Sequence, residues 1–181
     1  YTANEYLKNN QPRPGPIFEF GENFPDFLDQ FEPAASLSYL SDVARLEWAW
    51  NIAYHAAEEN PLSVQNLSSI PNDKLATISF NLHPSCQFIT SEFPIDKIWY
   101  ANQPNSSIDE ITLDDGANIL IVRPHESVNI HNLNPSIYHF LASLKAGQNV
   151  EQAYLMAIKN NRQINPAQTI IDLMDIGIFT D

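Results

Sequence analysis

Apolar and polar residues alternate with helical spacing between residues 38 and 58, a stretch without glycine or proline. We therefore expect one long helix here. Its apolar side chains fall on two faces, one made of Tyr39, Val43, Leu46, Trp50, Ala53 and Ala57 and the other of Ala44, Trp48 and Ile52. A polar stripe of Glu47, Asn51, His55 and Glu58 runs between them. Because a surface helix has a single apolar face, this helix is expected to lie between two packed bodies.

The chain before this helix predicts the end of one domain and a linker. Residues 1–11 predict the last turns of a helix that belongs to an upstream domain, because Tyr1 and Tyr6 have no evident packing partner at a free terminus. The proline-rich run at 12–16 predicts an extended connection. We therefore expect the first folded unit of this chain to begin near residue 17.

The hydrophobic period changes after a polar connection at 61–74, which marks a candidate domain boundary. Alternating residues from 75 onward predict strands. The expected elements are strands at 75–84 and 86–93, a short helix at 93–103, and a β-hairpin with strands at 116–124 and 127–133.

Three helices are expected after the hairpin, at 135–147, 149–161 and 165–179. Each begins at an asparagine suited to the N-cap position: Asn134, Asn149 and Asn165. Together the elements predict an α+β fold. We expect a domain end and linker at 1–16, a helical segment with one long central helix at 17–74, and a small antiparallel sheet followed by three helices, resembling a winged helix, at 75–181.

The charge balance limits the kinds of partner. The chain has 22 acidic and 9 basic residues, a formal net charge of −13. This charge repels phosphate backbones, so DNA binding by this segment is disfavoured and a cationic or neutral peptide is a more compatible partner. The single cysteine, Cys86, excludes an internal disulfide and fits a reducing, cytoplasmic compartment. No apolar run is long enough to span a bilayer, so no membrane partner is expected.

Histidine and acidic residues invite a metal hypothesis, but no complete site is evident. Glu47, Asn51 and His55 could present three ligands along one helix, yet metal pairs on helices need a matching second helix. A hydrated groove, or a hydrogen-bond network between two packed bodies, fits that stripe better. His125 and His131 lie on opposite strands of the hairpin and are expected to be solvent-exposed.

Motifs of catalysis are absent as well. The chain contains no P-loop, dinucleotide fingerprint, nucleophile elbow or H-E-x-x-H pattern. His83 lies in a turn and is expected to be structural, and Cys86 is expected to be a buried, inert thiol. We therefore expect a protein that is not an enzyme, with no catalytic residue, no metal and no cofactor.

The order strand, strand, helix, helix, helix has three interpretations. A winged-helix DNA reader needs a basic recognition helix, and helix 149–161 offers only Lys159 with Arg162 after it. A peptide-recognition module would pair an extended peptide with the outer edge of strand 127–133. The third interpretation is a hairpin and helices packed only for stability. The acidic balance favours the peptide module over the DNA reader.

Several blocks of the chain resemble the HvfC/BufC family, which is also described as a family of DNA-binding domains. The blocks are GENFPDFLDQF at 21–31, LSYLSDVARLEWAWNIAYH at 37–55, LHP at 82–84 and IWYAN at 98–102. The pattern Leu40-x-Asp42-x-Ala44-Arg45-x-Glu47-Trp48 is the most specific of them. Members of the family usually carry a further helical domain upstream, which agrees with the expectation for residues 1–11. The order of elements at 117–179 is also similar to PqqD-like peptide-recognition elements.

The resemblance implies a non-catalytic accessory protein. It would form a heterodimer with a multinuclear non-haem iron enzyme that oxidatively modifies cysteines of a ribosomally made peptide, and it would help to present the precursor of that peptide. Such peptides are linked to metal homeostasis. The alternatives are a transcriptional regulator that binds DNA through the upstream domain, and a purely structural interaction domain.

The residues expected to carry these roles fall into two sets. The peptide groove is expected to consist of Val128, Ile130 and Leu133 on the edge strand and of Ile170, Ile171 and Met174 on the last helix. Domain packing is expected to involve Arg45, Glu47, Trp48 and Trp50.

Overall fold

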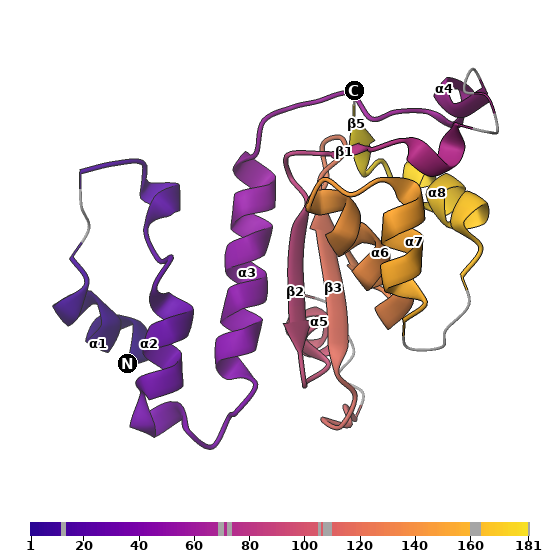
Figure 1. Cartoon of the computed structure of the whole chain (residues 1–181). Coiled ribbons are helices and arrows are strands. Elements are labelled where there is room, and N and C mark those ends of the chain that lie inside the picture. The colour runs from indigo at the N-terminus through magenta and orange to yellow at the C-terminus, as the bar shows by residue number, and fades with distance from the viewer. Residues whose placement is uncertain are drawn as a thin grey trace.

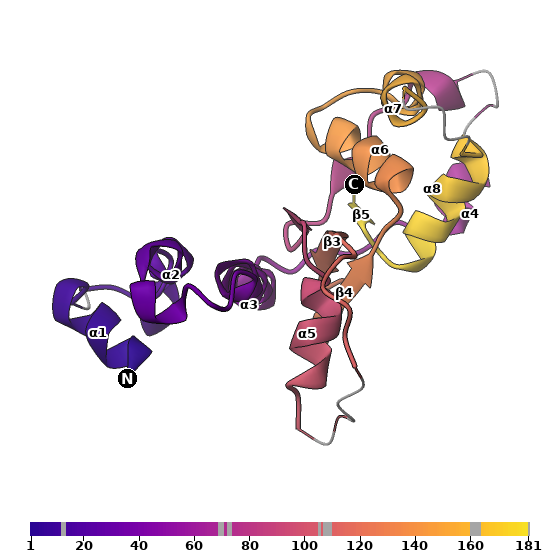
Figure 2. The ribbon, with the colours of Figure 1, turned by 90° about the horizontal axis from the view of Figure 1, so that it is seen from below.

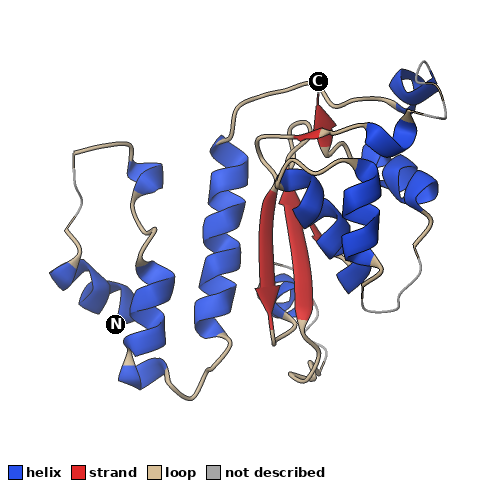
Figure 3. Ribbon diagram, viewed as in Figure 1, coloured by secondary structure: helices blue, strands red, loops and turns tan. Residues whose placement is uncertain are grey.

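The computed structural model describes residues 1–11, 14–68, 71, 74–104, 106, 110–159 and 164–180, apart from the side chains at 17, 67 and 68. The described chain has the predicted α+β fold, with helices toward the N-terminus and a small antiparallel sheet covered by further helices (Figures 1 and 3). Among the described residues, no helix is both long and apolar enough to cross a membrane.

Short helical elements form the N-terminal part: α1 (Thr2–Asn9), the 3-10 turn η1 (Ile17–Glu19), α2 (Phe24–Gln30) and the 3-10 turn η2 (Glu32–Ala34). Tyr6 is 5% exposed, and its ring centroid lies 5.2 Å from that of Phe24 and 5.5 Å from that of Phe27. The expectation that Tyr6 lacks a packing partner is therefore wrong, because α1 lies against the aromatic face of α2 within this chain.

Helix α3 (Leu40–His55) lies between α2 and the sheet in both views (Figures 1 and 2). Leu46, Ala49 and Ala53 join the core against the sheet. On the other side, Arg45 donates hydrogen bonds to carboxylates of α2. The prediction of one long helix between two packed bodies is confirmed.

The main sheet has the order β2–β3–β4, with antiparallel neighbours throughout: β2 (Gln87–Ser91), β3 (Ala117–Val122) and β4 (Asn129–Asn132). The central strand β3 pairs Ile119 with Ile89 of β2 and with Asn132 of β4. Helix α5 (Ile95–Ala101) connects β2 to β3 and covers one face of the sheet together with α3.

The opposite face of the sheet carries α6 (Pro135–Lys145), α7 (Val150–Ala157) and α8 (Pro166–Asp175), as Figure 2 shows. The predicted asparagine caps are confirmed at all three helices. Their side-chain oxygens accept hydrogen bonds from the N–H groups of Ile137, Gln152 and Ala167 at 3.0, 2.9 and 3.1 Å. Each cap satisfies a donor that the first helical turn leaves unpaired.

Two of the expected elements, one strand and one helix, differ from the structure. The predicted strand at 75–84 is a 3-10 turn, η3 (Leu75–Thr77), followed by the two-residue strand β1 (Asn81–Leu82), and α4 (Val64–Ser68) precedes both. The predicted helix at 165–179 stops at Asp175, and β5 (Phe179–Thr180) then pairs with β1. Gly177, with a φ of +72°, turns the chain from α8 into this strand.

Candidate functional site

The outer edge of β4 is the first feature of the candidate site. Among the described strands, none pairs with this edge. The backbone N–H of Leu133 donates to the carbonyl of Asn118 at 2.8 Å. Hydrogen-bonded pairs alternate along an antiparallel ladder, so Asn129 and His131 direct their backbone groups toward β3. Ile130 and Asn132 therefore direct theirs away from the sheet, where they can pair with another chain.

The two faces of β4 differ in chemistry. Ile130 packs with Val128 against the core shared by α3 and α5. Asn129 and His131 lie on the opposite face, over the side of the sheet that α8 covers. A peptide added to this edge would therefore present alternate side chains to an apolar face and to a polar one.

A groove of about 670 Å³ lies between β4 and the C-terminal end of α8. We call it the β4–α8 groove. Its lining residues are Pro61, Leu62, Ser63, Val64, Gln65, Pro124, His125, Asn129, His131, Met174, Asp175, Ile176 and Gly177. Asn129 and His131 of β4 belong to this lining, so a strand that pairs with the outer edge of β4 could place side chains in the groove.

Three of the lining residues, Pro61, Pro124 and Gly177, lie in close contact. A Cβ atom added at Gly177 would lie 2.5 Å from Cβ of Pro124 and 3.3 Å from Cγ of Pro61. The main chain continues this contact, since the N–H of Leu62 donates to the carbonyl of Phe179 at 2.8 Å. Three segments that are distant in sequence therefore meet at the lining of the groove.

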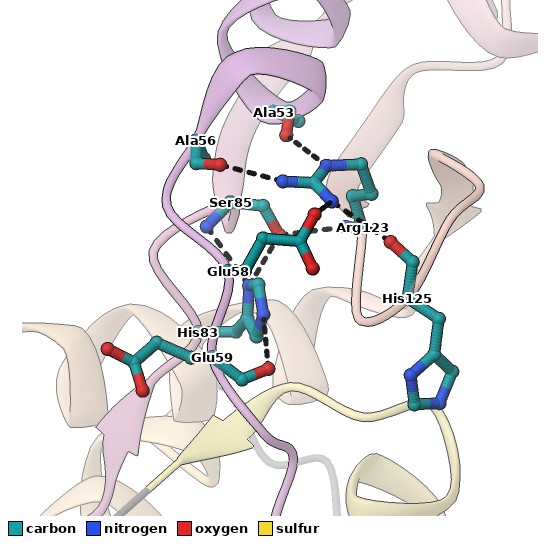
Figure 4. Close-up of polar contacts among 8 residues, drawn as sticks. All are labelled: Ala53, Ala56, Glu58, Glu59, His83, Ser85, Arg123 and His125. Atoms are coloured by element: carbon teal, nitrogen blue, oxygen red, sulfur yellow. Dashed lines mark hydrogen bonds and ion pairs between the residues drawn. The ribbon is translucent and has the colours of Figure 1, made fainter.

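Arg123 anchors the β3–β4 turn to the end of α3 (Figure 4). Its Nε donates to the carbonyl of Ala53 at 3.1 Å and its Nη2 to that of Ala56 at 2.7 Å. Its Nη1 donates to the carbonyl of His125 at 3.0 Å and to Oε1 of Glu58 at 2.8 Å. The guanidinium thus satisfies carbonyls at the C-terminal end of a helix, where a cation is favoured, and fixes the wall of the groove at His125.

His83 and Ser85 extend the Arg123 cluster, and their geometry defines the histidine tautomer. Nδ1 of His83 lies 2.7 Å from Oγ of Ser85 and accepts the N–H of that residue at 3.2 Å. Nδ1 is therefore unprotonated, and Nε2 donates to the carbonyl of Glu59 at 3.3 Å. Oγ of Ser85 also accepts the N–H of Arg123 at 2.8 Å.

The Ser85–His83 pair has the spacing of a nucleophile and its base, but its surroundings exclude that role. Ser85 is 0% exposed and His83 is 2% exposed, so no substrate reaches either of them. The second histidine nitrogen is bound to a carbonyl instead of a carboxylate that would stabilise an imidazolium. The pair is structural, as predicted for His83.

Acid is expected to weaken this cluster. Burial lowers the pKa of His83, and the nearby Arg123 cation contributes in the same direction. In the unfolded chain, histidine has a pKa of about 6.5. At pH values between this pKa and the lower pKa of His83 in the folded protein, the unfolded chain therefore binds more protons than the folded one. The contribution of neutral, buried His83 to the free energy of unfolding should be fully present above about pH 6.5. It should decrease as the pH falls toward the pKa of His83 in the folded protein. Urea unfolding across this pH range measures the loss.

The pH slope in a His83→Gln variant is the control for this prediction. Burial also lowers the pKa of His131, so part of the slope should remain in the variant. An unchanged slope would assign the whole effect to groups other than His83.

The six residues expected to form the peptide groove do not line one surface. Val128 and Ile130 pack toward α3 and α5, whereas Leu133 packs toward α6, α7 and α8. The buried residues Ile170 and Met174 belong to the core under α8. The expected set is therefore corrected: of the six, only Met174 lines the β4–α8 groove. The side-chain alternation of β4 places Asn129 and His131 there instead of its apolar residues.

Ile170 and the half-buried Ile171 line a different pocket, of about 550 Å³, between α4, η3, α7 and α8. This pocket is mainly apolar and includes Val150, Tyr154 and Pro166. It lies on α8 away from the strand edge, so the expected pairing of these isoleucines with β4 does not occur.

The expected packing residues are all on α3. Arg45 donates to Oδ1 of Asp42 at 2.8 Å, to Oδ1 of Asp26 at 3.2 Å and to Asp29, and so connects α2 to α3. The half-buried Trp48 lies near Gly21, before α2. Trp50 stacks on Tyr54 with ring centroids 5.4 Å apart. Glu47 is exposed.

The polar stripe of α3 holds another segment of the chain. Nδ2 of Asn51 donates to the carbonyl of Phe18 at 2.7 Å, and the ring of His55 stacks on that of Phe18 at 4.2 Å. This is the interaction network expected between packed bodies. Within the described ranges, no three histidine, cysteine or acidic residues are grouped to hold a metal ion.

Two further predictions about single side chains can be compared with the structure. Cys86 is buried, and burial raises the pKa of its thiol to about 12, so the thiol is protonated and inert at neutral pH. His125 is exposed as predicted, whereas His131 is half-buried beside the groove. Of the two cations weighed for DNA binding, Lys159 follows α7 and Arg162 lies outside the described residues.

No family model matches this chain, and comparisons with curated proteins and with solved structures find no match either. The resemblance to the HvfC/BufC family and to PqqD-like elements therefore stays a prediction.

Proposed function

We propose that this chain is a non-catalytic binding module that captures an extended peptide by strand addition at β4. The peptide is the precursor of a ribosomally made product, and the partner is a multinuclear non-haem iron enzyme that modifies it. The observation that carries the proposal is the outer edge of β4, which no described strand pairs with, beside the β4–α8 groove. Main-chain hydrogen bonds would give affinity, and the groove would select side chains. The iron enzyme and the precursor rest on the family resemblance alone.

Replacing Ile130 with proline is expected to abolish peptide binding while the domain stays folded. Its N–H faces outward, so proline removes a donor to the peptide and none of the donors to β3. The probe is a peptide of about ten residues selected from a displayed random library on the wild-type protein. Its affinity for each variant is measured by fluorescence anisotropy.

Two matched variants separate loss of the donor from loss of structure. Ile130→Ala removes packing but keeps the N–H, and it should retain binding. His131→Pro removes a donor to β3 and should unfold the hairpin. A selected peptide that binds Ile130→Pro as tightly as wild type would exclude strand addition. Slower hydrogen exchange at Ile130 and Asn132 in the complex would locate the peptide on this edge.

The partner enzyme is tested by affinity purification of the full-length protein from its native host. A stoichiometric iron protein in the eluate, together with a bound precursor, is the expected result. Specific DNA binding with a steep salt dependence would favour the transcriptional regulator instead.

A further inference from the structure

The β4–α8 groove is lined by one carboxylate, two histidines and otherwise uncharged residues. Asp175 is its one carboxylate, and the described residues that line it include neither lysine nor arginine. Asp175 is exposed, and no basic side chain pairs with it among the ion pairs of the described chain. The chain as a whole carries a formal net charge of −13, so an approaching cation is favoured over an anion.

The C-terminal end of α8 adds to this field. Backbone carbonyls give a helix a negative C-terminal end, where cations are stabilised and carboxylates are not. The last turn of α8 nevertheless contains Asp172 and Asp175 and no basic residue. Asp172 accepts a hydrogen bond from Nε2 of Gln168 at 2.7 Å, outside the groove. Asp175 lines the groove, so its carboxylate and the negative end of the helix would both attract a cation that enters the groove.

The register of β4 determines which side chains of an added strand would enter the groove. Residues directly opposite one another on neighbouring strands share a face of the sheet. A peptide residue opposite His131 or Asn129 would therefore point toward the groove. The residue between them, opposite Ile130, would lie on the apolar face with Val128 and Ile130.

We propose that the β4–α8 groove takes a lysine or arginine side chain of the bound peptide and holds it against Asp175 and the C-terminal end of α8. The peptide then carries a basic residue opposite His131 or Asn129 and an apolar residue opposite Ile130. This specificity rests on strand addition at β4, the function proposed above.

The test uses three labelled peptides of about eight residues. The first alternates valine with lysine, and the other two carry glutamine or glutamate at every lysine position. Each is titrated against wild type, Asp175→Asn and Asp172→Asn. The last variant is a matched control, because it removes the same charge from the same helical turn but from a residue that does not line the groove.

The lysine peptide should bind wild type best and the glutamate peptide worst. Asp175→Asn should weaken the lysine peptide by roughly threefold to tenfold, with the glutamine peptide unchanged and the difference reduced at high salt. Asp172→Asn should change neither affinity by more than about twofold. Equal losses in the two variants, or equal losses for the lysine and glutamine peptides, would overturn the specificity but leave strand addition intact. If none of the three peptides binds wild type, both proposals fail.

Discussion

Replacing Arg123 with methionine is expected to destabilise the fold by about 3–5 kcal/mol, because three charge-assisted hydrogen bonds to main-chain carbonyls are lost. Arg123 is 6% exposed, and methionine would fill much of its volume without donating a hydrogen bond. The carbonyls of Ala53, Ala56 and His125 would lose their donor; the bond to Ala53 is buried and the other two are partly buried. Urea unfolding measures the change in the free energy of unfolding.

Glu58→Gln is the control that separates the ion pair from the carbonyl contacts. The side chain of Glu58 is 85% exposed, so its pairing with Arg123 is screened by solvent. We expect this variant to cost less than about 1 kcal/mol. A comparable loss in both variants would mean that the ion pair, and not the bonds to the main chain, stabilises this junction.

The second large effect is expected from Gly177→Ala. The φ of Gly177 is +72°, a conformation that costs other residues about 1–2 kcal/mol. The added Cβ would also lie 2.5 Å from Cβ of Pro124, which forces the β3–β4 turn or β5 to move. Overpacking of this kind adds about 1–3 kcal/mol, so we expect a total loss of about 2–5 kcal/mol. Thermal and urea unfolding both report it.

Gly147→Ala offers a matched comparison for this variant. Its φ is +82°, but an added Cβ would meet no atom within 4 Å. It should therefore show the conformational cost alone, about 1–2 kcal/mol. Similar losses for the two alanine variants would show that Pro124 moves aside without a measurable loss of stability. The contact between Gly177 and Pro124 would then not be rigid.

Helices and their boundaries follow mainly from local sequence in this protein. The asparagine caps at Asn134, Asn149 and Asn165 act on N–H groups two or three residues away, so their signal is complete within one turn. The two apolar faces of α3 likewise predicted a helix packed on both sides. Local pattern failed at 75–84, where alternation predicted a strand. Of these residues, only Asn81 and Leu82 pair with another strand, and that strand is β5, about 100 residues later.

The candidate site depends on information that local sequence does not contain. The apolar residues of strand 127–133 predicted an apolar groove. Successive side chains of a strand point to opposite faces, however, and the pairing with β3 directs Ile130 toward α3 and α5. The register alone decides that Asn129 and His131 face α8. Arg123 gave no sequence signal, because two of the three carbonyls that it binds lie at the C-terminal end of α3, about 70 residues earlier.

By itself, the sequence determined an acidic α+β chain with one long helix between two bodies, a hairpin and three capped helices. These features depend on composition, on periodicity and on hydrogen bonds between near neighbours. Only the tertiary structure decided which edge of the sheet pairs with no described strand, which side chains line the groove beside it, and how Arg123, Pro124 and Gly177 hold that groove together. Those outcomes depend on strand register and on contacts between distant segments, which form only when the whole chain packs.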